Sequence, residues 1–595
     1  MLDPRIYRTG FVVAALALVV LAFSLQNQQG PLGSTLAPAA FNGPNVYSAM
    51  TTIARRDPDR RPGSDGDYAL ASQVDQSFIQ AFGKPAVSID TFTGRTVDGS
   101  RTLENVVAVR PGMESGSVVI VAHRDALGSP ALASLSGTAT LLELARDLQG
   151  ETLNHTVVLA STSGSQGTSG AIQLASTLSG PVDAVIVLGD LASAQVHQPI
   201  VVPWSTGQWV APPRLRNTLA AALGAQASLG AGTTGVAGQF AHLAFPFTLS
   251  EQAPFGARGV PAVLLSLSGD QEPAANAPVA GPAQITALGR AVLQTISALD
   301  SGPTVALPSA YLLFDGKVVP GWAIALFVLA LLVPVVLTTV DGLARARRRG
   351  HVIWRSLVLV LAAAAPFALG VLVVIAVRLL GIIVADPPGP VAAGAVPLDG
   401  TGIAVLAVAA CVVIGALAGV GAIAARVRPA RPEPAARART RSSDGAVAAL
   451  LLVMCVVTIV IWISNPFAAA LLVPALHLWL WAVNPDLRLR VPVRLLLVMI
   501  GLAPVVLVVL YYAGTLGFDP LQAAWAAALL VAGHGVSLVA ALEWSVVLGC
   551  LVSATTIALL AARGSRAEPA PITVRGPITY AGPGSLGGTK SALRR

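Results

Sequence analysis

The fold is decided by the stretch Val118–Arg146, which reads VVIVAHRDALGSPALASLSGTATLLELAR. Val118–Val121 is a short apolar run of the kind that a buried strand needs, and His123 and Asp125 follow where that strand would end. From Ser136 onward the apolar residues recur at helical spacing. In α/β folds, ligands bind where a strand ends and the chain leads into a helix. The stretch therefore predicts an α/β fold with a candidate site at His123 and Asp125.

The same alternation of strand and helix patterns extends on both sides of this stretch. Further strands are predicted at 106–109, 156–160, 185–188 and 262–267. Helices are predicted at 68–82, 136–148, 169–178, 214–223 and 285–299. This order favours a largely parallel or mixed sheet between helices, and about 250 residues suffice for one sizeable core.

Three further segments carry motifs in the same order along the chain. Arg61–Ser64 reads RPGS, residues 105–108 read NVVA, and Phe255 precedes GVPAV at 259–263. Together with the His and Asp of the central stretch they resemble the M28 family of zinc aminopeptidases over about residues 45–300. The resemblance implies a zinc-peptidase-like α/β fold, with a mixed sheet between helices.

The resemblance also implies a site for two metal ions. Such a site uses two His, two Asp and a Glu as ligands and a second Glu as the general base. His123 matches the first His, and Asp125 matches the Asp that orients it. Asp190 follows the apolar run 185–188 and matches the remaining Asp ligand.

Other positions of the implied site hold residues that cannot bind a metal. Ala133 stands where the bridging Asp is expected, and Gly164 and Ser165 stand where the two Glu are expected. The last His is missing, since no His occurs between His242 and His351. A site with two of five ligands and no general base would not hold two zinc ions.

The sequence therefore predicts no catalytic residue, no metal and no cofactor. His123, Asp125 and Asp190 are interpreted as vestigial positions of the site. Zinc would be bound only if the chain is an active peptidase with an altered site. In the vestigial interpretation His123 is a surface loop residue, so His123→Ala is expected to change stability by under about 0.5 kcal/mol.

The composition indicates a membrane protein. Hydrophobic residues make up 54% of the 595 residues and charged residues only 11%, and apolar runs of bilayer-spanning length explain this. Cys411, Cys455 and Cys550 all lie in such runs, so neither a disulfide nor a Cys-based zinc site is expected outside them. The net charge of +8 comes mostly from Arg beside the runs, which indicates membrane topology rather than nucleic-acid binding.

Six regions are predicted along the chain. They are a signal-anchor helix at 1–25, a linker at 26–44, an exported M28-like domain at 45–300, a linker at 301–321, a transmembrane bundle of seven or eight helices at 322–562, and a disordered basic tail at 563–595. The run Phe11–Leu25 follows Arg5 and Arg8 and fits a cleaved signal peptide as well; we favour the anchor, because no small-residue cleavage site follows directly.

The end of the bundle allows two topologies. Residues 523–562 hold either two helices broken near Glu543, which gives nine spans, or one spanning helix after an interfacial one, which gives eight. We favour nine, because this stretch is about twice the length that one span needs. Arg378 is interpreted as snorkelling at a helix end, with an intramembrane transport charge as the alternative.

Three functions fit these features. The first is a non-catalytic pseudoenzyme that binds a peptide or protein partner outside the membrane, in a layout similar to the large polytopic subunit of GPI transamidase. The second is an active membrane-bound zinc aminopeptidase, and the third is a transporter with an exported accessory domain. The expected partners are the lipid bilayer and a peptide or protein, and no nucleic acid.

A cysteine-accessibility experiment tests the topology. Residues 41–310 are expected outside the cell, and the N-terminus and the Arg-rich loops near 345–355, 426–441 and 488–494 inside, because short Arg-rich loops resist translocation. Cysteines placed singly at Ser565 and Ser591 should react with an impermeant thiol reagent in intact cells if there are nine spans. Protection of both until the cells are lysed would establish eight instead.

Overall fold

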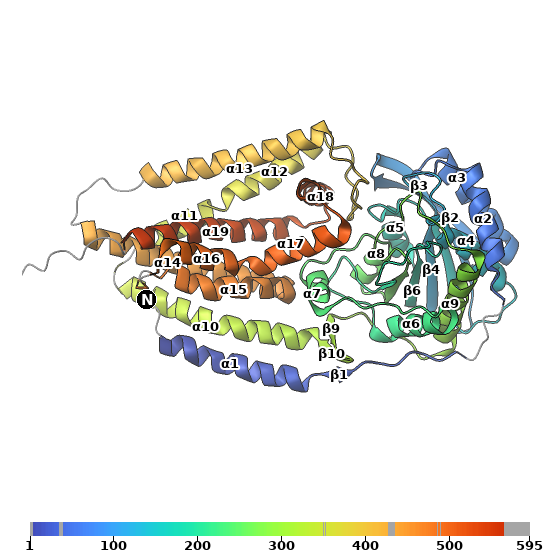
Figure 1. The fold of residues 1–595 in the computed structure, drawn as a ribbon, viewed down its shortest axis with the longest axis horizontal. Coiled ribbons are helices and arrows are strands. Elements are labelled where there is room, and N and C mark those ends of the chain that lie inside the picture. The colour runs from blue at the N-terminus through green and yellow to red at the C-terminus, as the bar shows by residue number, and fades with distance from the viewer. Residues whose placement is uncertain are drawn as a thin grey trace, which may run out of the picture.

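The computed structural model describes residues 4–34, 40–348, 350, 353–426, 435–484, 486–487 and 489–564. An α/β domain occupies one end of the molecule and a bundle of long helices the other (Figure 1). Almost all of the predicted basic tail at 563–595 and part of the Arg-rich loop at 426–441 lie outside the described residues.

The α/β domain is built on a mixed seven-stranded sheet in the order β2-β3-β5-β4-β6-β8-β7. β4, β5, β6 and β8 run parallel, whereas β2, β3 and β7 pair antiparallel to their neighbours. The strands are β2 Val87–Thr96, β3 Gly99–Arg110, β4 Ser117–His123, β5 Thr156–Thr162, β6 Val182–Leu188, β7 Val201–Val202 and β8 Ala262–Leu265. The predicted fold class and all five predicted strands are confirmed.

The central strand β4 is buried on both faces. Val119 and Val121 point into one hydrophobic core, while Val118, Ile120 and Ala122 point into the other. A strand covered on both sides reads as a continuous apolar run, which is why its sequence shows no alternation. β2 and β7 were not predicted, because β2 carries polar residues on its exposed side and β7 has only 2 residues.

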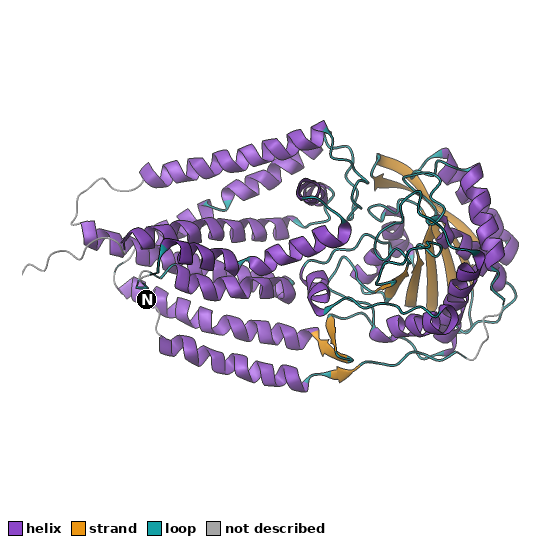
Figure 2. Ribbon diagram, in the orientation of Figure 1, coloured by secondary structure: helices purple, strands orange, loops and turns teal. Residues whose placement is uncertain are grey.

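Helices cover both faces of the sheet (Figures 1 and 2). One core contains side chains of α2 Gly43–Arg56, α3 Asp65–Phe82, α4 Leu135–Asp147, α6 Pro213–Ala227 and α9 Pro282–Ser301. The other contains side chains of α5 Ser169–Thr177, α7 Val236–Ala244 and α8 Gln252–Ala257. A short 3-10 helix, η1 Lys84–Ala86, precedes β2. The five predicted helices correspond to α3, α4, α5, α6 and α9.

The two segments predicted as linkers, 26–44 and 301–321, contain regular structure. β1 Gln26–Asn27, β10 Lys317–Pro320 and β9 Tyr311–Phe314 form a three-stranded antiparallel sheet in that order. Asp315 and Gly316, both at positive φ, make the turn between β9 and β10, and Asp-Gly between apolar residues is a strong hairpin signal. α2 begins within the first linker, where the Asn42 side chain caps its N-terminus.

The bundle consists of α1 and the helices that follow β10. Their bounds are α1 Pro4–Phe23, α10 Gly321–Arg348, α11 Ile353–Ala362, α12 Ala365–Leu379, α13 Gly400–Arg426, α14 Ala435–Ser464, α15 Pro466–Ala482, α16 Val491–Gly501, α17 Ala503–Leu516, α18 Pro520–Ala532 and α19 Leu538–Gly564. Within the described residues, 6 helices are long and apolar enough to cross a membrane, or 7 if α16 and α17, bent by 54°, form one span. The chain thus has the features of a multi-pass membrane protein.

The break between the last two helices, predicted near Glu543, is at another position. Glu543 lies inside α19, and the chain breaks between α18 and α19, after Ala532 and before Leu538, where Gly533 and Gly535 weaken the helix. α18 is only 13 residues long and is seen end-on in Figure 1, whereas the helices beside it run along the bundle. This arrangement favours the interfacial helix of the eight-span alternative.

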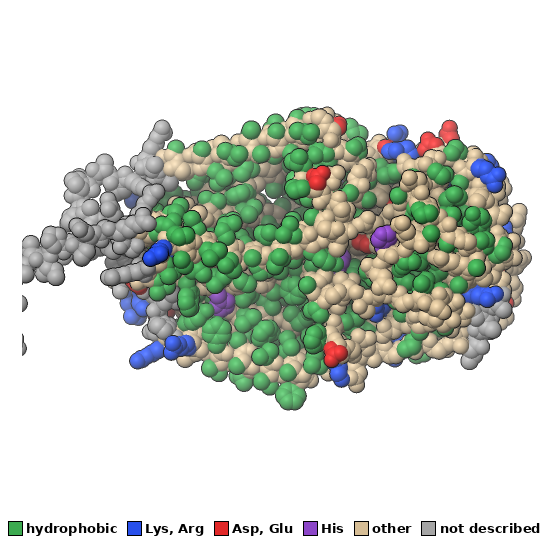
Figure 3. Space-filling view, viewed as in Figure 1, with side chains coloured by type: hydrophobic (Ala, Val, Ile, Leu, Met, Phe, Trp, Pro, Cys, Tyr) green, Lys and Arg blue, Asp and Glu red, His purple; other side chains and the backbone are tan. Residues whose placement is uncertain are grey.

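The surface of the bundle is apolar between its two ends. Figure 3 shows hydrophobic side chains along the visible flank, with Lys and Arg at the end remote from the α/β domain and on the domain itself. α1 and α10 both have one end at that remote end, and α10 finishes there with Arg345, Arg347 and Arg348 (Figure 1). Basic residues at one end of apolar helices agree with the expected topology, whose sidedness stays a prediction.

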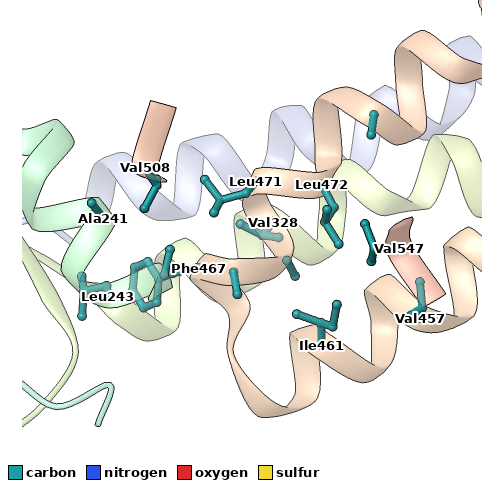
Figure 4. Close-up of a cluster of buried hydrophobic side chains, with 14 of the residues drawn as sticks. Ala241, Leu243, Val328, Val457, Ile461, Phe467, Leu471, Leu472, Val508 and Val547 are labelled. Atoms are coloured by element: carbon teal, nitrogen blue, oxygen red, sulfur yellow. The ribbon is translucent and has the colours of Figure 1, made fainter. Parts of the chain in front are cut away.

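One hydrophobic core runs from the sheet into the bundle. It begins with Val119 and Val121 of β4, passes through α7, and continues into α15 and α14. Figure 4 shows Leu243 of α7 beside Phe467 of α15. The ring of Phe467 also meets Phe240 of α7 edge to face, with 5.7 Å between the ring centroids.

Gly137, in the stretch that decides the fold, tests the packing of α4 against the sheet. A Cβ at this position would lie 2.3 Å from the Leu188 carbonyl oxygen and 2.8 Å from that of Gly189, both backbone atoms of the β6 end. Gly137→Ala should therefore destabilise the chain by about 1–3 kcal/mol in thermal unfolding of the purified protein in detergent. The control Gly224→Ala, in α6 with open space around the added methyl, should be neutral or slightly stabilising. Equal unfolding temperatures for the two variants would contradict this packing.

Candidate functional site

The predicted site residues lie at the carboxyl ends of the parallel strands. His123 is the last residue of β4, Asp125 follows it, and Asp190 follows β6. All three are buried, with exposed fractions of 7%, 1% and 1%. Their placement at one edge of the sheet is the arrangement that α/β folds use for ligand sites.

His123 is a buried strand residue, which corrects its interpretation as a surface loop residue. Its Nδ1 lies 3.0 Å from the backbone oxygen of Asp125 and 3.8 Å from the carboxylate of the same residue. Burial lowers the pKa of His123, but the charges of Glu272, Asp125 and Glu251 raise it by more, so the net shift is upward. The expectation that His123→Ala changes stability by under about 0.5 kcal/mol therefore loses its basis, because it held only for a surface residue.

Ser165 holds Asp125 in place. The Ser165 backbone N–H and hydroxyl each lie 3.0 Å from Asp125 Oδ2, and both donate to it. Ser165 stands where the M28 resemblance places a Glu, and it follows Gly164, whose φ of +85° suits glycine. Burial raises the pKa of Asp125, while His123 and the bonds from Ser165 oppose the shift. The loop thus supplies hydrogen-bond donors to Asp125 where the family would supply carboxylates.

Asp190 is also fully engaged with its own chain. Its Oδ1 accepts hydrogen bonds from the backbone N–H groups of Ala192 at 2.9 Å and Ser193 at 2.8 Å. Its Oδ2 accepts a hydrogen bond from the hydroxyl of Ser268. These bonds fold the β6 end into a compact turn and use both oxygens that the resemblance assigns to a metal.

The residues present do not fit a zinc ion. In the part of the chain that the structure describes, no three His, Cys, Asp or Glu side chains are grouped so that they could hold a metal. Asp190, the carboxylate that matches a ligand position, accepts three hydrogen bonds from its own chain. A zinc site needs at least three protein ligands with free lone pairs.

Two carboxylates near His123 were missed from the sequence. Glu251 is 2% exposed, and its Oε1 accepts a hydrogen bond of 2.7 Å from the Thr162 hydroxyl at the end of β5. Burial raises the pKa of Glu251 to about 7, although the charge of His123 opposes the shift. Glu272 acts electrostatically on His123, Asp125 and Glu251. The sequence signal that could have found Glu251 is its position as a single acidic residue in the apolar segment before Phe255.

A cavity of about 860 Å³ lies beside this cluster. Its walls come from the loop 268–278, from α7, from Val202 of β7 and Trp204 after it, and from four residues of α17, Tyr511, Tyr512, Thr515 and Leu516. Glu272 lines the cavity and also faces the buried cluster. The bundle therefore contributes one wall of the cavity next to the predicted site.

Comparisons with known proteins give fold-level likenesses only. No protein-family model matches the chain, and no curated protein matches its sequence. Among solved structures, a glutaminyl cyclase from an Acidobacteriales bacterium is 18% identical, covers 46% of this chain and 99% of its own, and gives a TM-score of 0.37. The LapA aminopeptidase of Legionella pneumophila is 16% identical over 45% of this chain and 74% of its own, with a TM-score of 0.35.

An aminopeptidase from Aneurinibacillus sp. strain AM-1 is 12% identical, covers 45% of this chain and 96% of its own, and gives a TM-score of 0.37. Likenesses at this level carry no argument about activity. The fold class of the domain rests on its own sheet and helices, described above.

Glu251 makes stability depend on pH in a defined direction. Its carboxyl has an ordinary pKa of about 4.5 in the unfolded chain and about 7 in the folded chain, so between these values the folded chain holds a proton that the unfolded chain has lost. Raising the pH through this window should lower the free energy of unfolding, on the order of a few kcal/mol in total.

Glu251→Gln should flatten this dependence, measured as denaturant unfolding between pH 5 and pH 8, because the amide keeps the bond from Thr162 without ionising. Asp147 and Asp270, whose pKa values burial raises to about 6, keep a slope of the same sign below that pH, so the effect of Glu251→Gln is read above about pH 6. The control Glu114→Gln changes an exposed side chain and should leave the slope as it is. An unchanged slope in Glu251→Gln would contradict the assignment.

Proposed function

We propose that the α/β domain is a non-catalytic, M28-like binding domain that holds a peptide or protein partner outside the membrane, fixed to a multi-pass bundle. The observation that carries the proposal is the engagement of Asp190, the matched ligand position, by hydrogen bonds from Ala192, Ser193 and Ser268, in a described chain with no group of three side chains that could hold a metal. Carboxylates held in this way are structural supports, whereas a metallopeptidase needs them free to bind metal.

The layout supports the same proposal. The combination of an anchor helix, an exported domain and a polytopic bundle resembles the layout of the large polytopic subunit of GPI transamidase. This likeness concerns the layout alone and implies no substrate. α17 contributes side chains to the cavity beside the site, so a ligand held there would contact the domain and the bundle together. Such a site suits the presentation of a partner at the membrane surface.

An active hydrolase is the second candidate, and one observation favours it. Glu251 has its pKa raised to about 7, which is near the value that suits a general base at neutral pH. The charge of His123 acts on Glu251, so the two side chains lie within electrostatic reach of each other. No transport pathway is proposed, since neither observation bears on ion or solute passage.

Metal content and activity of the full chain separate the two candidates. We expect purified protein, incubated with zinc and then dialysed, to retain no zinc by elemental analysis and to leave aminoacyl and pyroglutamyl-forming peptide substrates unchanged. The Glu251→Gln variant should behave identically. Two tightly held zinc ions per chain with chelator-sensitive aminopeptidase activity would refute the binding-domain proposal, and metal-free hydrolysis lost in Glu251→Gln would establish the second candidate.

A further inference from the structure

The cavity between the α/β domain and α17 has a lining of one charge sign. Asp270 and Glu272 both line it, and no Lys or Arg does so among the described residues. The Asp270 carboxylate is held by the hydroxyls of Thr248 and Ser250 and by the Leu249 N–H at 3.2 Å. Burial raises the pKa of Asp270 to about 6, which leaves it mostly ionised at neutral pH. A lining of this kind attracts cations and repels carboxylates and phosphates.

Glu272 is the carboxylate that is available to a ligand. It is half-buried in the cavity wall, and none of the hydrogen bonds or ion pairs found in the described residues uses its carboxylate. The carboxylate oxygens of Asp270, in contrast, accept hydrogen bonds from Thr248, Leu249 and Ser250. Glu272 can therefore face an incoming positive charge, while Asp270 keeps the loop in shape and adds to the negative potential.

The cavity also has an aromatic wall. Trp204 stacks on His242 with ring centroids 4.6 Å apart and planes 4° apart. Tyr511 and Tyr512 of α17 meet the edge of this stack, with centroids 6.0 Å and 5.4 Å from that of His242. Burial lowers the pKa of His242 to about 4, so the imidazole is neutral and does not repel a cation. Asp270 lies within electrostatic reach of Tyr511 and Tyr512, and electron-rich rings near a carboxylate attract ammonium groups through cation–π contact.

We propose that this cavity binds the ammonium group of a ligand, with Glu272 as the counter-charge and Trp204, Tyr511 and Tyr512 as the aromatic wall. The site adjoins the vestigial metal positions through Glu272, whose charge reaches His123, and α17 extends it to the bundle. The proposal rests on the proposed function and adds a chemical class to its ligand. A peptide amine and the amine of a lipid headgroup both carry this chemistry, and the test below separates the two sources.

The primary test uses two probes of equal shape and different charge. Choline and its neutral carbon isostere, 3,3-dimethylbutan-1-ol, are titrated into the full chain in detergent micelles by calorimetry. Choline should bind at least about tenfold more tightly than the isostere, since only choline gains the charge interaction. Equal affinity for the two probes would overturn the proposal.

Variants locate the binding to the cavity. Glu272→Gln should weaken choline binding about tenfold, and Tyr511→Leu should weaken it about threefold, because it removes one ring from the wall. Glu114→Gln, at the opposite edge of the sheet, should leave the affinity unchanged. The thermal unfolding temperature of each variant is measured in parallel, and two folded cavity variants with unaltered affinity would overturn the proposal.

Two further arms identify the source of the ammonium group. Trialanine amide should bind more tightly than its N-acetyl form if the ligand is a peptide. Choline binding should be weaker in nanodiscs of phosphatidylcholine than in those of phosphatidylglycerol if the ligand is a lipid headgroup. Binding of both peptides alike, indifferent to Glu272→Gln, would leave the peptide-binding function standing and refute the ammonium site. Choline binding without binding of either peptide would support the ammonium site and refute the peptide-binding function.

Discussion

The contact of α7 with α15 and α17 joins the two halves of this protein, and the position of the cavity depends on it. Phe240 and Leu243 of α7 pack against Phe467, and this contact belongs to the core that continues from β4 into the bundle. Burial of apolar side chains is the main stabilising term in such a contact, and it holds the helices together without setting their relative orientation. The orientation has to come from polar groups at the same junction.

Asn465 makes hydrogen bonds that orient α15 relative to α7. Its side-chain oxygen accepts from the backbone N–H groups of Phe467 and Ala468, which caps the first turn of α15. Its side-chain nitrogen donates to the carbonyls of Leu243 and Ala244 at the end of α7, at 2.9 Å and 3.0 Å. One amide therefore satisfies unpaired backbone groups at the start of one helix and the end of another. Tyr512 adds a hydrogen bond of 2.7 Å from its hydroxyl to the Phe245 carbonyl.

Charged groups join the domain to the bundle at a second place, between β2 and the end of α12. Asp386 accepts from Arg378 Nε at 2.7 Å, at the end of α12, and lies 3.4 Å from Arg95 of β2. Arg378, interpreted as snorkelling from a membrane helix, thus has a partner carboxylate outside the helix. The pairs are partly exposed, so each contributes little stability. Gln166, in the loop after β5, accepts from the Ala392 N–H, and Arg95 donates to the Gly533 carbonyl, so these parts of the domain contact the segments that connect the bundle helices.

The sequence by itself determined the α/β class, five strands, five helices and the apolar spans, because each depends on local periodicity and on runs of buried residues such as Val118–Val121. It also placed His123, Asp125 and Asp190 at strand ends. The tertiary structure alone decided what these residues contact: Ser165 on Asp125, Ser268 on Asp190, and the buried Glu251 beside His123. These pairs join residues tens of positions apart, and no local pattern encodes a hydrogen bond or a pKa set by burial. The cavity was invisible for the same reason, since its walls come from a loop, α7 and α17, which only the packing of the domain against the bundle brings together.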